Sequence, residues 1–214
     1  MKIKLAYPKI PDTLDCPLKQ CIAFEKYDGT NIHWTFMPGE GWQDYGARRD
    51  RYAINTTGVR AFEEAHPELK GVHTLWDQKD LLNDFLNENP KYNTAKEIIV
   101  FTEYLGPHSF AGQHDPKDVI KQLIIFDVQV DGSLIPPEQF VEDFKQFNIA
   151  RVVFQGKFSG QLFVDVRKGK YDVKEGVVVK GIYNNQIYMA KIKTEAYMER
   201  LKNEFKDNWK EYWE

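Results

Sequence analysis

The residues that most directly suggest chemistry surround Lys26, in the string Glu25–Asn31 (EKYDGTN). A lysine amine attacks electrophilic phosphorus or carbonyl centres once it is deprotonated, so Lys26 is a candidate covalent nucleophile. The string also has an ordinary explanation, because lysines are usually solvated and an Asp-Gly pair is common in hairpin turns. The choice depends on whether the rest of the chain supplies the groups that such a nucleophile needs.

Four other places put charged residues inside or at the end of strand-like apolar runs, where a charge needs a partner, a metal or a ligand. They are Glu103, the pair Phe126-Asp127, Glu175 before a valine run, and Lys191-Ile192-Lys193. Alternate residues of a strand face the same side, so the two lysines share one face. They repel each other unless an anion such as a nucleotide phosphate lies between them. Taken alone, this pair is better explained by an edge strand that lysines protect from aggregation.

These residues require a sheet framework. Residues 21–24 and 31–36 predict two strands, joined at Asp28-Gly29 as a hairpin or strand-turn-strand with Lys26 near its tip. The runs rich in β-branched residues predict further strands at 97–101, 123–128, 176–179 and 186–190.

Helical patterns lie between the strands. Asp77 is a predicted N-cap for a helix over 81–86, and Pro137 opens one that carries Phe140, Phe144 and Phe147 on one face. Residues 161–168 favour a strand, although Ser159 is also suited to cap a short helix there. Thr194 is expected to cap a closing helix that carries Tyr197, Leu201, Phe205 and Trp209.

The predicted architecture is α+β, with antiparallel sheets flanked by helices. At 214 residues the chain fits a single domain. We expect residues 1–20 to form an extended arm, 21–193 the core and 194–214 a C-terminal helix.

Composition excludes several classes of protein. The chain is 42% hydrophobic with a formal net charge of −3, so it folds, and a polyanion must be held by a local basic patch. Cys16 and Cys21 lack the spacing of a zinc or redox site. No uncharged stretch of membrane-spanning length is present, which predicts a cytoplasmic protein.

The order of these sites resembles a known family. Lys26-Tyr-Asp-Gly, Glu103, Phe126-Asp127, Glu175-Gly176 and Lys191-Ile-Lys193 are similar to the five collinear motifs of the covalent nucleotidyltransferases, which include DNA ligases, RNA ligases and mRNA capping enzymes. The resemblance covers about 21–193. Glu25, Asn31 and the string that begins at Glu103 resemble RNA ligases of the RNA ligase 2 type in particular. The fold implied is a nucleotidyltransferase (adenylation) domain of two antiparallel sheets, here without an OB-fold domain.

The resemblance also implies a role for each residue. Lys26 is the nucleophile that attacks the α-phosphorus of ATP and forms lysyl-AMP. Glu175 is the expected ligand of Mg²⁺ or Mn²⁺, with Asp127 assisting. Arg48 is an alternative to Arg49 as the site arginine. The residues implied to contact the nucleotide are Glu25, Asn31, Arg49, Glu103, Phe126, Lys180, Lys191 and Lys193.

The function implied is an ATP-dependent RNA ligase that joins RNA 5′-phosphate and 3′-hydroxyl ends, either as free ends or in a nicked duplex. RNA repair by a cellular or virus-encoded enzyme is the implied process, with no membrane and no obligate protein partner. The alternatives are a DNA-nick ligase, another covalent nucleotidyltransferase such as a capping guanylyltransferase, or a non-catalytic nucleotide- or RNA-binding module on the same fold.

Overall fold

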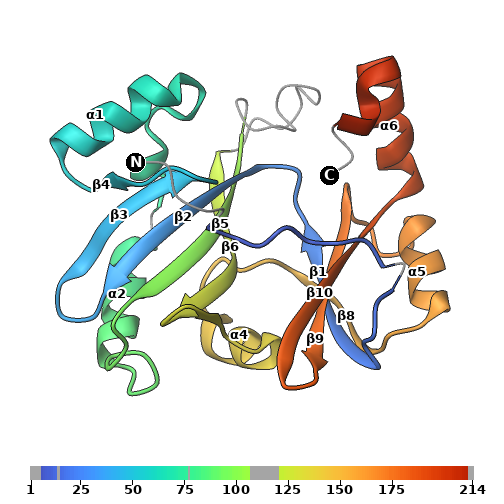
Figure 1. Ribbon diagram of the computed structural model, residues 1–214, viewed down its shortest axis with the longest axis horizontal. Coiled ribbons are helices and arrows are strands. Elements are labelled where there is room, and N and C mark those ends of the chain that lie inside the picture. Colours follow the sequence, from blue (N-terminus) through green and yellow to red (C-terminus); the bar gives the residue numbers. More distant parts are fainter. Residues whose placement is uncertain (1–5, 14, 77, 107–120, 212–214) are drawn as a thin grey trace. The chain divides into compact units, whose positions relative to one another are not determined.

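Two antiparallel sheets form the framework of the protein, and helices flank them (Figure 1). The computed structural model describes residues 6–13, 15–76, 78–106 and 121–211. The first compact unit consists of Gly29–Ile135 and Gln139–Ile149 with the segment that ends at Lys9; the second consists of Ile10–Asp28, Pro136–Glu138 and Ala150–Glu214. The predicted α+β class with two antiparallel sheets is confirmed.

The first unit contains a six-stranded sheet of order β4-β3-β2-β5-β6-β7. On its central strand β2, Ile32, Trp34 and Phe36 are buried and alternate with residues of the other face. The Trp34 ring stacks on Tyr45 with centroids 5.1 Å apart. The strands are β2 (Thr30–Met37), β3 (Gly41–Ala47), β4 (Tyr52–Ala53), β5 (Ile98–Leu105), β6 (Gln122–Val130) and β7 (Ser133–Leu134).

Helices of the first unit complete its aromatic core. The predicted apolar face of the helix that begins at Pro137 is confirmed, since Phe140, Phe144 and Phe147 are all buried, although Phe147 lies beyond the end of the helix. Phe144 and Phe147 each pack edge-on against Phe85, with centroids 5.4 Å apart. The predicted cap at Asp77 lies outside the described residues. The helices are α1 (Thr56–Ala65), η1 (Pro67–Leu69), η2 (Val72–Thr74), α2 (Lys79–Glu88) and α4 (Pro137–Phe144), of which Gln139 onward belongs to this unit.

The second unit contains a four-stranded sheet of order β10-β9-β1-β8. The ambiguous run 161–168 is helical: in α5 (Gly160–Arg167), Ser159 Oγ accepts a hydrogen bond from the Leu162 amide at 3.3 Å. Leu162 and Val166, one turn apart, bury their side chains against the core of the sheet. The strands are β1 (Gln20–Lys26), β8 (Val152–Lys157), β9 (Gly176–Tyr183) and β10 (Gln186–Lys193).

The edge of the four-stranded sheet is covered in part by the extended arm. Strand β10 is an edge strand, and the amide of Lys191 donates to the carbonyl of Pro11 at 2.9 Å. The described part of the arm contains no helix, as its prolines predict. The arm therefore continues the hydrogen bonding of the sheet by one contact.

Two predictions about local structure need correction. Of the two alternatives at Asp28-Gly29 the hairpin is wrong, because β1 pairs with β8 and β9 whereas β2 pairs with β3 and β5; the chain runs from one strand through a bend into the next. The closing helix is shorter than expected: α6 (Glu195–Phe205) is capped by Thr194 but stops before Lys206, whose φ of 46° is left-handed. Trp209 lies in the following η3 (Lys206–Glu211).

Candidate functional site

Lys26 and Lys193 lie on the same rung of the four-stranded sheet. Lys26 of β1 and Lys193 of β10 are both directly opposite Gly176 of the central strand β9. Residues that face each other across antiparallel strands project to the same side. Because glycine has no side chain, nothing from β9 separates the two lysines at this rung.

The carboxylate of Glu175 binds both ammonium groups. Lys26 Nζ lies 2.9 Å from Oε1 and 2.9 Å from Oε2, and Lys193 Nζ lies 3.2 Å from Oε1. Only 2% of the Glu175 side chain and 7% of the Lys193 side chain are exposed, whereas Lys26 is 25% exposed. Three of the predicted site residues thus form one cluster, in which Lys26 has the most access to solvent.

Burial changes the acidity of this cluster. Loss of water around the Lys193 ammonium lowers its pKa, and the charge of Lys26 lowers it further, while Glu175 and Asp28 act in the opposite direction. Its ring neighbour is Tyr197, whose centroid lies 4.9 Å from Nζ. The balance favours release of a proton from a site that holds two ammonium groups.

The same face of the sheet carries two further lysines. Lys191 and Lys180 are two and four rungs from Lys193, so their side chains share its side of the sheet. Lys180 is 4% exposed, with Nζ 5.0 Å from the centroid of the Phe24 ring. Strand β10 is an edge strand, so its lysines could serve to prevent aggregation. That explanation does not account for the burial of Lys193 or for its contact with Glu175.

Helix α6 holds the aspartate that follows Lys26. Tyr197 Oη donates to Asp28 Oδ1 at 3.0 Å, and Arg200 Nη2 lies 3.5 Å from Oδ2. Burial raises the pKa of Tyr197, so it remains a donor. From the sequence, Tyr197 was predicted only as an apolar residue of the closing helix. Its contact with Asp28 joins residues far apart in the chain and leaves no pattern in the sequence.

Glu25 and Lys26 are consecutive in β1 and therefore project to opposite faces. Glu25 Oε2 accepts a hydrogen bond from Arg151 Nε at 2.8 Å, and Arg151 also donates to the carbonyl of Asp172. This pairing was not foreseen. It places the Glu25 carboxylate against an arginine and away from the lysine-bearing face.

In the first unit, Asn31 and Glu103 are cross-strand neighbours on β2 and β5. Glu103 Oε1 accepts a hydrogen bond from the Gly29 amide at 3.0 Å. A Cβ at Gly29 would lie 2.4 Å from the carbonyl oxygen of Tyr104, so glycine serves here for close approach to β5. Among the described residues, Asn31 Oδ1 is buried without a hydrogen-bond partner, which leaves an acceptor for a ligand.

A β-bulge places Phe126 and Asp127 together. Phe101 is opposite Asp127 while Thr102 is opposite Ile125, so Phe126 is the extra residue of β6. Tyr7 contacts both: its ring lies edge-on to Phe126 with centroids 5.0 Å apart, and its hydroxyl donates to Asp127 Oδ2 at 2.6 Å. Burial and the charge of Asp127 raise the pKa of Tyr7. The prolines that predicted the extended arm gave no indication that Tyr7, which lies in it, would make these contacts.

The arginine string lies between β3 and β4. Arg48 and Arg49 are both exposed, and Arg48 has a left-handed φ of 46°. Arg51 instead lies 3.3 Å from Asp44 and 3.8 Å from Glu97. The geometry therefore does not choose between Arg48 and Arg49 as the site arginine.

Among the described residues, no group of three or more His, Cys, Asp or Glu side chains gathers as a metal site. Mg²⁺ commonly takes one or two carboxylates and completes its shell with water and substrate phosphate. The single carboxylate of Glu175 fits an ion that arrives with a nucleotide. None of the helices in the described ranges has both the length and the apolar composition needed to cross a bilayer.

Comparison with known proteins agrees with this framework. The fold is similar to that of the Naegleria gruberi RNA ligase solved with pyrophosphate, with a TM-score of 0.61 and 13% identity, over 94% of this chain and 61% of that chain. A variant of the same enzyme with ATP and Mn gives a TM-score of 0.59 at 12% identity, over 92% and 60%. The fold is also similar to that of an archaeal ATP-dependent RNA ligase, with a TM-score of 0.56 and 15% identity, over 93% of this chain and 51% of that chain.

These similarities define the class of fold as that of RNA ligase nucleotidyltransferase domains, as the motifs implied. The family model described as RNA ligase matches residues 19–193. The chain belongs to the RNA ligase family. It spans about three fifths of the Naegleria enzyme and about half of the archaeal one. No curated protein matches the sequence.

Proposed function

We propose that the protein is an ATP-dependent RNA ligase that works through a lysyl-AMP intermediate on Lys26. The observation that supports this most directly is the rung of Lys26, Gly176 and Lys193, closed by Glu175, in a chain of the RNA ligase family. A second, buried lysine beside Lys26 disfavours its ammonium form, as a nucleophilic amine requires, and the Glu175 carboxylate holds the amine in place.

In the proposed first step, Lys26 Nζ attacks the α-phosphorus of ATP. A P–N bond forms, the bond from the α-phosphorus to the bridging oxygen breaks, and pyrophosphate leaves with that electron pair. The Glu175 carboxylate, 2.9 Å from Nζ, is positioned to receive the proton that the amine loses. Lys191 and Lys193 stabilise the charge on the phosphoryl oxygens, and Lys180 contacts the AMP phosphate.

The residues of the first unit have proposed roles toward the rest of the nucleotide. Phe126 offers a planar face to adenine, Glu103 accepts from the ribose hydroxyls, and Asn31 contacts the AMP phosphate. Arg49, or Arg48 in its place, reaches the ribose or the incoming 5′-phosphate. The unpartnered oxygen of Asn31 is the observation in this unit that favours a bound ligand. Glu25 accepts from the amino edge of adenine in this proposal, which requires it to leave or share Arg151 and to reach the base from the face opposite to Lys26.

A divalent cation completes the proposal. Glu175 would hold Mg²⁺ or Mn²⁺ together with phosphate oxygens and water, and Asp127 is the second proposed ligand. The ion supplies charge neutralisation at the phosphates. Since Glu175 and Asp127 are already bound by Lys26 and Tyr7, either contact has to change for direct ligation.

The test is incubation with α-labelled ATP and Mg²⁺ or Mn²⁺, followed by denaturing electrophoresis and mass measurement of the chain. Labelled AMP should attach to the chain, and Lys26→Ala should abolish the adduct. Lys157→Ala, on exposed β8 of the same sheet, is the matched control and should retain it. Absence of an adduct, or its survival in Lys26→Ala, would refute the proposal and favour a non-catalytic binding module.

The acceptor is tested with the adenylylated chain. A 5′-phosphorylated RNA should receive AMP and then join to a 3′-hydroxyl RNA, releasing AMP. The same assay with an all-DNA nick distinguishes the DNA ligase alternative, which a strong preference for that substrate would establish. Competition of GTP against ATP for adduct formation tests the capping alternative.

A further inference from the structure

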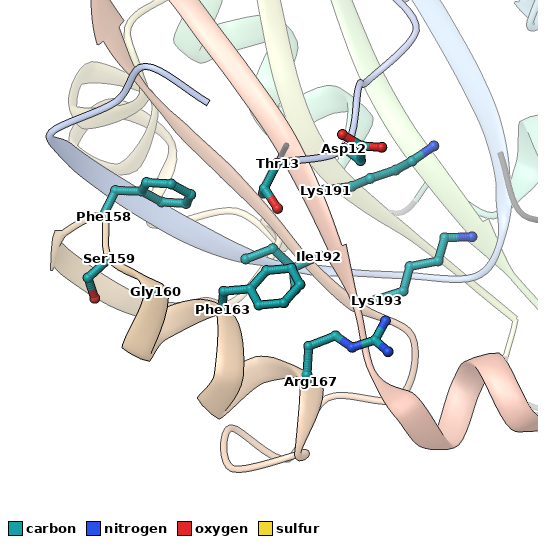
Figure 2. A pocket seen from close by; sticks show the side chains of 10 residues that line it. All are labelled: Asp12, Thr13, Phe158, Ser159, Gly160, Phe163, Arg167, Lys191, Ile192 and Lys193. Atoms are coloured by element: carbon teal, nitrogen blue, oxygen red, sulfur yellow. The ribbon is translucent and has the colours of Figure 1, made fainter. Parts of the chain in front are cut away.

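A cavity of about 460 Å³ lies beside β10 in the second unit, between α5 and the extended arm (Figure 2). Its volume is within the usual range of ligand sites. The rings of Phe158 and Phe163 lie toward one end, and Arg167, Lys191 and Lys193 lie toward the other. The proposed adenylylation chemistry uses the two lysines but gives no role to the rest of the cavity.

The charge of the lining favours an anion. Three cationic residues line the cavity, of which Lys193 is also bound by Glu175, and Asp12 is the one acidic residue among its lining residues, although the whole chain carries a net charge of −3. Arg167 Nε lies 3.7 Å from Glu195, longer than a hydrogen bond, and the Arg167 side chain is 30% exposed. A guanidinium in this state has donors that can bind phosphate oxygens.

The apolar lining requires more than a phosphate. Phe163 and its neighbour Val164 are 39% and 40% exposed, whereas Leu162 and Val166 of the same helix are buried, and of the two exposed side chains only Phe163 lines the cavity. Pyrophosphate or a triphosphate tail has no planar apolar surface that would use such a ring. A nucleotide has both a planar base and a phosphate, and stacking of bases on exposed aromatic rings is the common mode of binding single strands.

We propose that this cavity binds the 5′-phosphorylated end of the RNA strand that accepts AMP. Its terminal base stacks on Phe163, with Phe158 as the neighbouring apolar wall, and Arg167 binds the 5′-terminal phosphate. Helix α5 has eight residues and is about 12 Å long, enough to accommodate one nucleotide along its side. Lys191 and Lys193 line the cavity at the edge strand β10 but project to the face that carries Lys26, opposite to Ile192 and α5. The end of the strand therefore passes the edge of β10 to reach the lysyl-AMP of the proposed function, on which this inference rests.

The first experiment measures binding without ATP or metal, so it does not depend on turnover. Fluorescence anisotropy with a short 5′-phosphorylated oligoribonucleotide should show that Phe163→Leu and Arg167→Gln each weaken binding about ten-fold, the scale of one stacked base or one charged contact. Phe163→Tyr keeps the ring and should bind as the unchanged chain does. Val164→Ala and Lys168→Gln, exposed neighbours on or next to α5 that do not line the cavity, are the matched controls.

The second experiment separates the cavity from the first step. Phe163→Leu and Arg167→Gln should form the AMP adduct at the rate of the unchanged chain but transfer AMP to the 5′-phosphorylated RNA about ten-fold more slowly at subsaturating RNA. A slower adduct in Arg167→Gln would assign the cavity to the triphosphate and overturn the inference. Unchanged RNA binding in both variants, or an equal loss for a 5′-hydroxyl RNA in Arg167→Gln, would also overturn it. If the unchanged chain forms no adduct, the proposed function fails, and the binding experiment still decides about the cavity.

Discussion

At the scale of single residues, Glu175 is the group on which the lysine cluster depends. It is almost fully buried and is the shared carboxylate of Lys26 and Lys193. Buried charges are costly unless paired, and removal of one partner leaves the other without compensation. The same side chains therefore affect both the folding stability of the second unit and its proposed chemistry.

Glu175→Gln should lower the free energy of unfolding by about 3 kcal/mol, since it leaves the buried Lys193 ammonium without its counter-charge. Replacement of both partners, Glu175→Gln with Lys193→Met, should restore part of that loss. Denaturant titration measures both. Glu25→Gln, which breaks a pair with the half-exposed Arg151, is the control and should cost less than about 1 kcal/mol. Equal losses in the two single variants would contradict this account.

His33 gives the first unit a dependence on pH. It is buried on β2, and burial, with a smaller contribution from the charge of Arg51, lowers its pKa from 6.5 to about 4. Between these values the unfolded chain binds a proton that the folded chain does not, so stability falls as the pH falls from 6.5 to 4. The contribution is up to about 3 kcal/mol.

Thermal unfolding of the chain and of His33→Phe across pH 4 to 8 should show a smaller loss in the variant below pH 6.5. Other titrating groups are common to both proteins and cancel in the difference. Parallel curves would show that His33 does not contribute.

At the scale of elements, Gly176 sets the distance between β9 and β10. A Cβ at this position would lie 2.0 Å from the carbonyl oxygen of Ile192. The rung of Lys26 and Lys193 is centred on this residue. The glycine thus has a steric role and not the turn role that glycine often has.

Gly176→Ala should separate the strands, destabilise the chain by roughly 1–3 kcal/mol and reduce the yield of lysyl-AMP. Denaturant titration and adduct formation measure the two effects. Ile182→Ala, on an exposed position of the same strand, should change stability by no more than about 0.5 kcal/mol. A stable Gly176→Ala with normal adduct formation would refute the role of this spacing.

The sequence predicted β1, β2, β5, β6, β9 and β10 because β-branched runs and alternation depend on local residues, and Thr194 was identified as a cap for the same reason. Strands β3, β4, β7 and β8 were not predicted. It did not predict that β1 and β2 belong to different sheets. Asp28-Gly29 has the composition of a turn, and that composition is the same whether the flanking strands pair with each other or with other strands. The cluster of Lys26, Glu175 and Lys193 was anticipated from motif order. The contacts of Tyr7, Arg151 and Tyr197 were missed because they join residues far apart in the chain and leave no periodic pattern.

At the scale of the whole molecule, a net charge of −3 repels a polyanion, so RNA binding must depend on a few local cations. The proposed cavity supplies three of them. A protein of this kind should show a modest dependence of binding on salt.

The slope of log K against log salt for a single-stranded RNA should be about −2 for three phosphate contacts, and about −1.4 in Arg167→Gln. Anisotropy titrations at salt concentrations from about 50 to about 200 mM measure this slope. Lys168→Gln should keep the slope of the unchanged chain. A much steeper slope in all three would place the main electrostatic contact outside the cavity.

The contact between the arm and β10 also determines where the four-stranded sheet stops. Pro11 accepts a hydrogen bond from Lys191 through its carbonyl but has no N–H to offer outward. A strand of another copy that approached from this side would find no donor at that position, which is how natural edges resist intermolecular pairing. Proteolytic trimming that removed Pro11 would uncover the Lys191 amide, and the expected result is self-association through β10 and not simply the loss of a few terminal residues.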